Sequence, residues 1–163
     1  MTKTIVGIDP GLRGGVAIFD PGATIPNVLA LPLTKERFVD CRAIVQVIEK
    51  VSRGTPVKVY IERVWAMPKQ GGVERFLKNA GMLLGMCQTS GYWFMEVLPK
   101  TWKYAILPER GGHDKLSAIV YCHNKYPSVS LLPTYRCKKP SDGIADAIVI
   151  ADYGRLHVDT VGK

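Results

Sequence analysis

The first regular element of the chain is predicted in the stretch Thr4-Ile5-Val6-Gly7-Ile8-Asp9-Pro10-Gly11. Its apolar and β-branched residues predict a buried strand, and the Pro-Gly pair that follows ends it. The strand closes on a carboxylate, which at the end of a buried strand needs a cation, a hydrogen-bond donor or solvent around it. Asp9 is therefore the first candidate functional residue.

Two later segments repeat this pattern of an acid at the edge of an apolar element. The segment Val57-Lys58-Val59-Tyr60-Ile61-Glu62 predicts a second buried strand ending on an acid. Asp142 and Asp146 open an apolar helix and, being four residues apart, share one of its faces. Simple capping of the helix N-terminus would explain one of these two acids. It would not explain the apolar run 147–151, which directs the helix into the core.

We expect the four acids to meet in space, and their chemistry then favours a metal site. Carboxylates brought together without a cation repel one another and bind protons more tightly. Hard divalent cations remove that penalty, and oxygen ligands suit Mg²⁺, with Mn²⁺ as a substitute. Two such ions about 4 Å apart can support phosphodiester hydrolysis. The predicted metal ligands are Asp9, Glu62, Asp142 and Asp146.

The composition favours a globular protein with an anionic partner. The chain has 163 residues, 47% of them hydrophobic, which fits one α/β domain spanning 1–163. The net charge of +8 favours nucleic acid as the partner, although a merely basic protein would show the same value. We expect neither a signal peptide nor a membrane span, and the spacing of the four cysteines favours reduced thiols in a cytoplasmic compartment.

The order of predicted elements favours a mixed sheet. Three short strands near the N-terminus form an antiparallel meander, and a helix over 35–51 leads to the strand ending at Glu62. A helix over 73–90, a strand over 92–97 and three further helices over 99–106, 113–125 and 141–155 complete the chain. This order resembles the ribonuclease H-like fold, a five-stranded mixed sheet with helices on both faces.

The predicted helix over 73–90 is apolar on more than one face. Gly81 and Gly85 lie four residues apart on it, and a helix of this kind is buried on both sides. In so small a domain the second side is expected to meet another subunit, which predicts a homodimer. The alternative is a central helix enclosed by a single chain.

Three segments together resemble the RuvC-like Holliday-junction resolvases. They are Ile5–Gly11, Ile61–Gly71 and Asp142–Ile148, in the order and at the chain length typical of that family. The likeness is greatest to the small phage and prophage members and more distant to the chloroplast ones. The first segment alone is weak evidence, because actin-like ATPases begin similarly.

The resemblance implies a dimeric, Mg²⁺-dependent endonuclease that cuts opposed strands of a four-way DNA junction in recombination and repair. It implies catalytic roles for the four acids and for Lys115, whose alternative is an ordinary exposed lysine. The last two acids are four residues apart here and three apart in many bacterial members, so both are kept. Trp65 lies where the family places an aromatic residue that stacks at the open junction, and its alternative is ordinary packing.

Further DNA contacts are expected from residues near these motifs or from charge alone. Junction-facing candidates are Trp65, Lys69, Gln70 and Arg75. Backbone-contact candidates are Arg13, Lys103, Arg110, Lys138 and Lys139. Other functions remain open at this stage: a ribonuclease H-like nuclease acting on RNA–DNA hybrids or on flapped and branched DNA, or a non-catalytic nucleic-acid-binding module. The intact set of acids argues against the latter.

Overall fold

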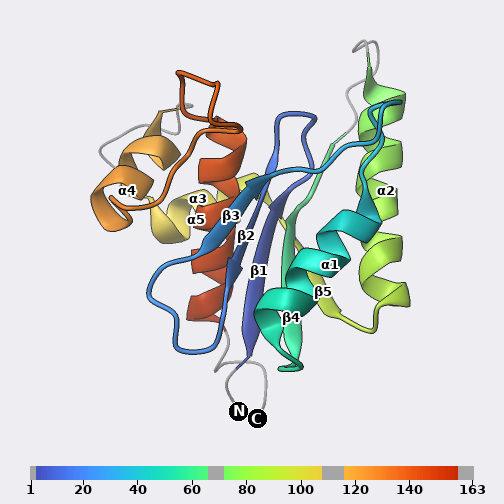
Figure 1. Cartoon of the computed structure of the whole chain (residues 1–163), viewed down its shortest axis with the longest axis horizontal. Helices are drawn as coiled ribbons and strands as arrows, with labels where there is room; N and C mark the ends of the chain where they lie inside the picture. Colours follow the sequence, from blue (N-terminus) through green and yellow to red (C-terminus); the bar gives the residue numbers. More distant parts are fainter. Residues whose placement is uncertain (1–2, 66–71, 108–115, 158–163) are drawn as a thin grey trace.

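A five-stranded mixed sheet forms the centre of the molecule, with the strand order β3-β2-β1-β4-β5 (Figure 1). The computed structural model describes residues 3–65, 72–107 and 116–157. The strands are β1 (Thr4–Asp9), β2 (Gly15–Phe19), β3 (Asn27–Ala30), β4 (Val57–Glu62) and β5 (Trp93–Val97). The first three pair antiparallel, and β4 and β5 extend the sheet in parallel with β1. The predicted fold class is confirmed.

Helices cover both faces of this sheet (Figure 1). One face carries α1 (Cys41–Ser52) and α2 (Val73–Thr89). The other carries α3 (Pro99–Ile106), α4 (Ser117–Lys125) and α5 (Asp142–Leu156). Alternation along the strands separates the two cores: Val6 and Ile8 face the α1 and α2 side, whereas Ile5 and Tyr60 face α5.

The helix α5 packs directly on β1 and β2. Its residues 147–154 are all buried, as the apolar run in the sequence predicted. A Cβ atom on Gly7 of β1 would lie against the backbone of Ala147 and Ala151, so only glycine permits this close approach. At the start of the helix, Gly143 bridges Gly14 of the β1–β2 loop. These contacts fix the N-terminal turns of α5 beside the end of β1.

Two predicted helices begin later than expected. The helix predicted from residue 35 begins at Cys41, where the Asp40 side chain accepts a hydrogen bond from the Ala43 amide at 3.0 Å. The preceding residues instead form a tight turn, in which Arg37 has a φ of 64° and Leu33 bridges Val39. The helix predicted from residue 113 begins at Ser117, and residues 113–115 lie outside the described ranges.

All four cysteines are free thiols, as their spacing predicted. Within the described ranges, no helix combines the length and the apolar character needed to cross a bilayer.

Candidate functional site

Asp9 and Glu62 end neighbouring strands at the same edge of the sheet. The parallel register pairs Ile8 of β1 with Ile61 of β4, so the two acids that follow leave the sheet side by side. Asp9 accepts a hydrogen bond from the Gly11 amide at 3.0 Å, because the Pro-Gly turn folds that amide back onto the carboxylate. Glu62 accepts one from the indole Nε1 of the fully buried Trp102 at 3.1 Å.

The helix α5 brings the other two acids to this edge. Ser141 caps the helix through a hydrogen bond from the Ile144 amide to its hydroxyl at 3.3 Å. The same hydroxyl donates to the Arg13 carbonyl at 3.3 Å, which ties the helix start to the loop that follows Asp9. Asp142 and Asp146 therefore project from the first two turns of α5, and both are half-buried. The N-cap is Ser141, and Asp142 also accepts a hydrogen bond from the Gly143 amide at 3.1 Å, so bonding at the helix end accounts in part for Asp142 and not for Asp146.

Burial and the negative charges of neighbouring acids raise the pKa values of Asp9, Glu62 and Asp146. Burial, with a smaller contribution from the charge of Asp142, raises the pKa of Asp9 to about 6, against the lowering effect of the Gly11 amide. Burial, followed by the charges of Asp9 and Asp146, raises the pKa of Glu62 to about 7. The pKa of Asp146 also rises to about 7, through burial first and then the charges of Asp9 and Asp142. Carboxylates that share a partly buried space in this way would be stabilised by a cation.

Lys103 of α3 supplies a positive charge to this cluster. Its ammonium group is near enough to lower the pKa values of Asp9, Glu62 and Asp146, partly offsetting their burial. Charge alone had suggested only a DNA backbone contact for this lysine. Its position arises because α3 follows β5, whose C-terminal end lies at the same edge of the sheet as those of β1 and β4. That neighbourhood depends on tertiary structure and has no local signal in the sequence.

The donor set fits a hard divalent cation in chemical type: oxygen ligands, partial burial and mutual repulsion. None of the ion pairs within residues 3–65, 72–107 and 116–157 neutralises these four carboxylates. In the same ranges, no group of three or more His, Cys, Asp or Glu side chains is already arranged to hold a metal ion. The carboxylates would have to move closer together to share one.

The remaining predicted residues lie around this edge or outside the described ranges. Trp65 is 60% exposed, with the Arg63 guanidinium 4.9 Å from its ring centroid, so it is not packed in the core. Arg13 is exposed in the loop after Asp9. Arg75 lines a hollow with Leu12 of that same loop. Lys138 and Lys139 are exposed in the loop that precedes α5. The residues outside the described ranges are Lys69, Gln70, Arg110 and Lys115.

Comparison with known proteins bears on the architecture. The chain is similar to T. thermophilus RuvC in complex with a Holliday junction substrate, with a TM-score of 0.57, 17% identity, and coverage of 97% of this chain and 96% of that one. It is also similar to a Thermus thermophilus RuvC structure, with a TM-score of 0.53, 19% identity, and coverage of 94% and 96%. The chain has the RuvC fold. No protein-family model and no curated protein matches it in sequence.

The fold thus agrees with the resemblance seen in the three sequence segments. At this level of identity the likeness establishes architecture alone. The candidate site lies at the C-terminal edge shared by β1, β4 and β5 and at the start of α5.

Proposed function

We propose that this protein is a metal-dependent endonuclease that cuts opposed strands of four-way DNA junctions. The observation that carries the proposal is the convergence of Asp9, Glu62 and Asp146, with mutually raised pKa values, at one edge of a RuvC fold. A basic protein with a net charge of +8 is suited to a polyanionic substrate that approaches such a site.

Asp9, Glu62 and Asp146, with Asp142 beside them, would hold Mg²⁺ or Mn²⁺. Such a cation, when bound, supplies an activated water and stabilises negative charge on the scissile phosphate. Hydrogen bonds from the chain would orient two of these ligands: the Gly11 amide orients the Asp9 carboxylate, and the Trp102 indole orients the Glu62 carboxylate. Lys103 places a positive charge where a phosphate would add negative charge to the cluster.

Two exposed groups are suited to contact DNA beside this cluster. Trp65 presents an exposed ring next to Arg63, and an aromatic ring of this kind can stack on an unpaired base. Arg13, in the loop between Asp9 and β2, is positioned to contact a phosphate near the carboxylates. The T. thermophilus protein of the same fold was solved with a Holliday junction substrate, which supports branched DNA as the substrate class.

A homodimer is part of this proposal, because a four-way junction offers two equivalent strands to a two-fold protein. The helix α2 presents an open face: a Cβ atom on Gly81 or Gly85 would meet no atom within 4 Å. Leu77 and Met82 on this helix are 40% and 39% exposed. This open face supports the homodimer over a helix enclosed by a single chain.

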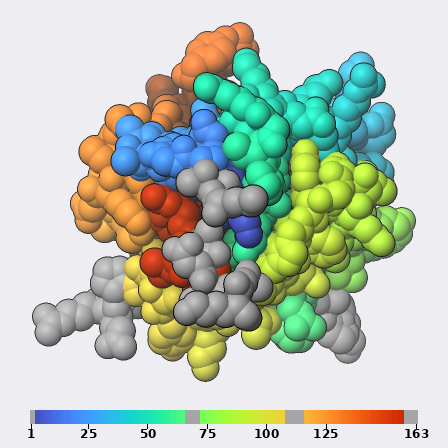
Figure 2. All heavy atoms as spheres, turned by 90° about the horizontal axis from the view of Figure 1, so that it is seen from below, coloured from blue at the N-terminus to red at the C-terminus, as the bar shows by residue number. Residues whose placement is uncertain are grey.

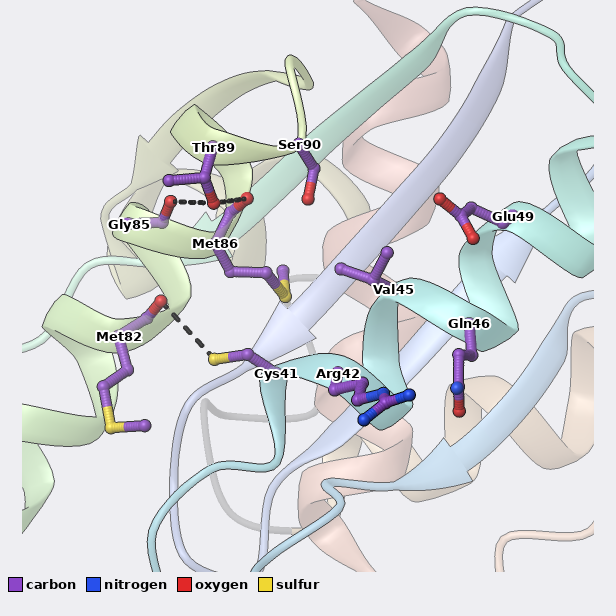
Figure 3. Close-up of a pocket in the computed structure, with 10 residues that line it drawn as sticks. All are labelled: Cys41, Arg42, Val45, Gln46, Glu49, Met82, Gly85, Met86, Thr89 and Ser90. Atoms are coloured by element: carbon purple, nitrogen blue, oxygen red, sulfur yellow. Dashed lines mark hydrogen bonds between the residues drawn. The ribbon is translucent and has the colours of Figure 1, made fainter.

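The open face of α2 continues into a groove between α1 and α2 of about 620 Å³ (Figure 3). Met86, Val45 and the open side of Gly85 line it, and the Cys41 thiol donates to the Met82 carbonyl across it at 3.5 Å. The small residues on α2 leave room for a side chain of a second copy to enter. We infer that this groove and the Gly81–Gly85 stripe form the dimer interface.

One assay tests the activity. The protein is incubated with a synthetic four-way junction, a plain duplex and an RNA–DNA hybrid, each with Mg²⁺ or with a chelator. We expect paired, symmetric nicks in the junction alone, only with Mg²⁺. Equal cutting of the hybrid would indicate a ribonuclease H-like nuclease of different specificity, and binding without cutting would indicate a non-catalytic module.

The variant Asp9→Asn tests the site within that assay. It removes one charge from the carboxylate cluster and keeps the shape of the side chain, so we expect cutting to fall by at least about 100-fold while junction binding persists. Glu36→Gln, which removes an exposed acid remote from the cluster in sequence, is the matched control. Cutting by Asp9→Asn at the rate of the control would refute the ligand assignment.

A further inference from the structure

The loop that leads into α5 is a second candidate DNA-binding element. Between residues 127 and 140 the chain has three basic residues, Arg136, Lys138 and Lys139, and no acidic one. The loop closes on itself, because the Ser141 amide donates to the carbonyl of the buried Leu131 at 2.8 Å. Its base is therefore fixed one residue before Asp142, at the edge that carries the carboxylates.

The tip of this loop presents an aromatic ring to solvent. Tyr135 is 85% exposed, the highest value among the exposed large apolar side chains of the described ranges. The Arg136 Nε donates to the Tyr135 hydroxyl at 2.8 Å, and the guanidinium carbon lies 5.3 Å from the ring centroid. A turn in which the Cys137 amide donates to the Thr134 carbonyl at 3.0 Å supports the pair. The ring is held in place without being buried.

The same combination of an exposed ring and an adjacent arginine occurs at Trp65 and Arg63, which follow β4. Figure 1 shows that the segment after β4 and the loop before α5 leave the same end of the molecule, near the end of β1. Figure 2 shows the opposite end, where the end of α5 (red) lies beside the orange segment of α4. The two aromatic–arginine pairs thus belong to the end with the carboxylates.

We propose that residues 131–141 bind an unpaired DNA strand, with the Tyr135 ring stacking on a base and Arg136, Lys138 and Lys139 contacting phosphates. The proposal rests on the proposed function in that the strand would be one exposed in branched DNA. Aromatic rings bind single strands through stacking on any base, and neighbouring cations follow the backbone. Positive charge alone would bind duplex and single strand without needing the ring.

Binding measurements with substitutions at Tyr135 test this. Fluorescence anisotropy at fixed salt would use a labelled single-stranded oligonucleotide, the matching duplex and a four-way junction. We expect Tyr135→Leu to weaken single-strand binding about tenfold and Tyr135→Phe to change it by less than about twofold, because stacking requires the ring. Lys50→Ala, which removes an exposed charge near the end of α1, is the control for charge and should match the wild type.

The outcomes separate this inference from the proposed function. If Tyr135→Leu binds the single strand as tightly as the wild type, or if duplex binding falls equally, the stacking role is wrong. If the wild type neither prefers nor cuts the junction while Tyr135→Leu still loses single-strand affinity, the junction activity is wrong and the loop assignment stands. Because Tyr135 is exposed, unchanged circular dichroism and melting temperature of the variants would show that they fold.

Discussion

Asp152 is a buried acid in α5 that the proposed chemistry does not use. It is 3% exposed and accepts hydrogen bonds from the Tyr126 hydroxyl at 2.7 Å and the Tyr121 hydroxyl at 2.9 Å. It also pairs with Lys125 at 3.1 Å and Arg155 at 3.3 Å. The network joins α4 to α5 six residues beyond Asp146, which is fewer than two helical turns. Its role is therefore to hold the helix that carries the catalytic candidates.

We expect Asp152→Asn to lower the free energy of unfolding by about 1–3 kcal/mol. The change leaves two partly exposed cations without their carboxylate and mismatches the buried hydroxyl donors. Urea unfolding monitored by circular dichroism would measure the loss. Glu74→Gln, at a fully exposed ion pair with Lys78, should unfold like the wild type. Equal stability of the two variants would contradict the assignment.

The raised carboxyl pKa values predict how the metal-free protein responds to pH. Asp9, Glu62 and Asp146 bind protons more tightly when folded than when unfolded, with pKa values of about 6, 7 and 7. The stabilisation from their protonation is complete below about pH 4 and is lost as pH rises through 6 to 7. With a chelator present, we therefore expect the melting temperature to be lower at pH 8 than at pH 5.

The same experiment with Asp146→Asn assigns this effect to the cluster. The variant removes one of the titrating groups, so its melting temperature should fall less between pH 5 and pH 8. Adding Mg²⁺ at pH 8 should raise the melting temperature of the wild type more than that of the variant, because a cation relieves the same repulsion. An identical pH dependence in both proteins would show that other groups dominate.

At the scale of elements, the sequence predicted the parts whose causes are local. The apolar strands that end on Asp9 and Glu62, and the apolar helix after Asp142, each have a pattern within a short window. The placement of Lys103 among the acids has no such pattern, since it depends on where α3 leaves β5. The start of α1 was predicted too early because Phe38 and Val39 fit helical spacing while belonging to a turn.

The contact of α5 with β1 predicts opposite outcomes for one substitution at two glycines. In Gly7→Ala the new Cβ would lie on the backbone of Ala147 and Ala151, so the helix must move; we expect a loss of about 1–3 kcal/mol in unfolding free energy. Within a single chain Gly85→Ala meets no atom and lies inside α2, so at concentrations where the protein is monomeric it should be neutral or stabilising by up to about 1 kcal/mol. Urea unfolding of both variants would measure the difference, and a loss at Gly85 as large as at Gly7 would contradict this packing.

For the whole molecule, the question is whether two copies associate through α2. The edge strand β5 also exposes Trp93, Phe94 and Met95 at 37–39%. Phe94 pairs with Val59 and so lies on the α2 face, whereas Trp93 and Met95 lie on the α5 face beside Tyr60. Edge strands of this kind are usually covered in native proteins. An interface that includes α2 and reaches β5 would cover Phe94.

Gly85→Glu tests the dimer without disturbing the single chain, because the space around Gly85 is open within it. The glutamate side chain would fill the space that the second copy is proposed to enter, and pairing with Arg42 of the groove would not restore that space. We therefore expect sedimentation velocity to show a monomer where the wild type shows a dimer. Asn124→Glu adds the same charge to α4 on the other side of the sheet and should remain dimeric. On a four-way junction the monomeric variant should nick strands singly, since the two nicks are paired only when one dimer presents both sites. If Gly85→Glu remains a dimer, the interface does not lie on α2. If a monomeric variant still makes paired nicks, paired cutting does not require a two-fold dimer.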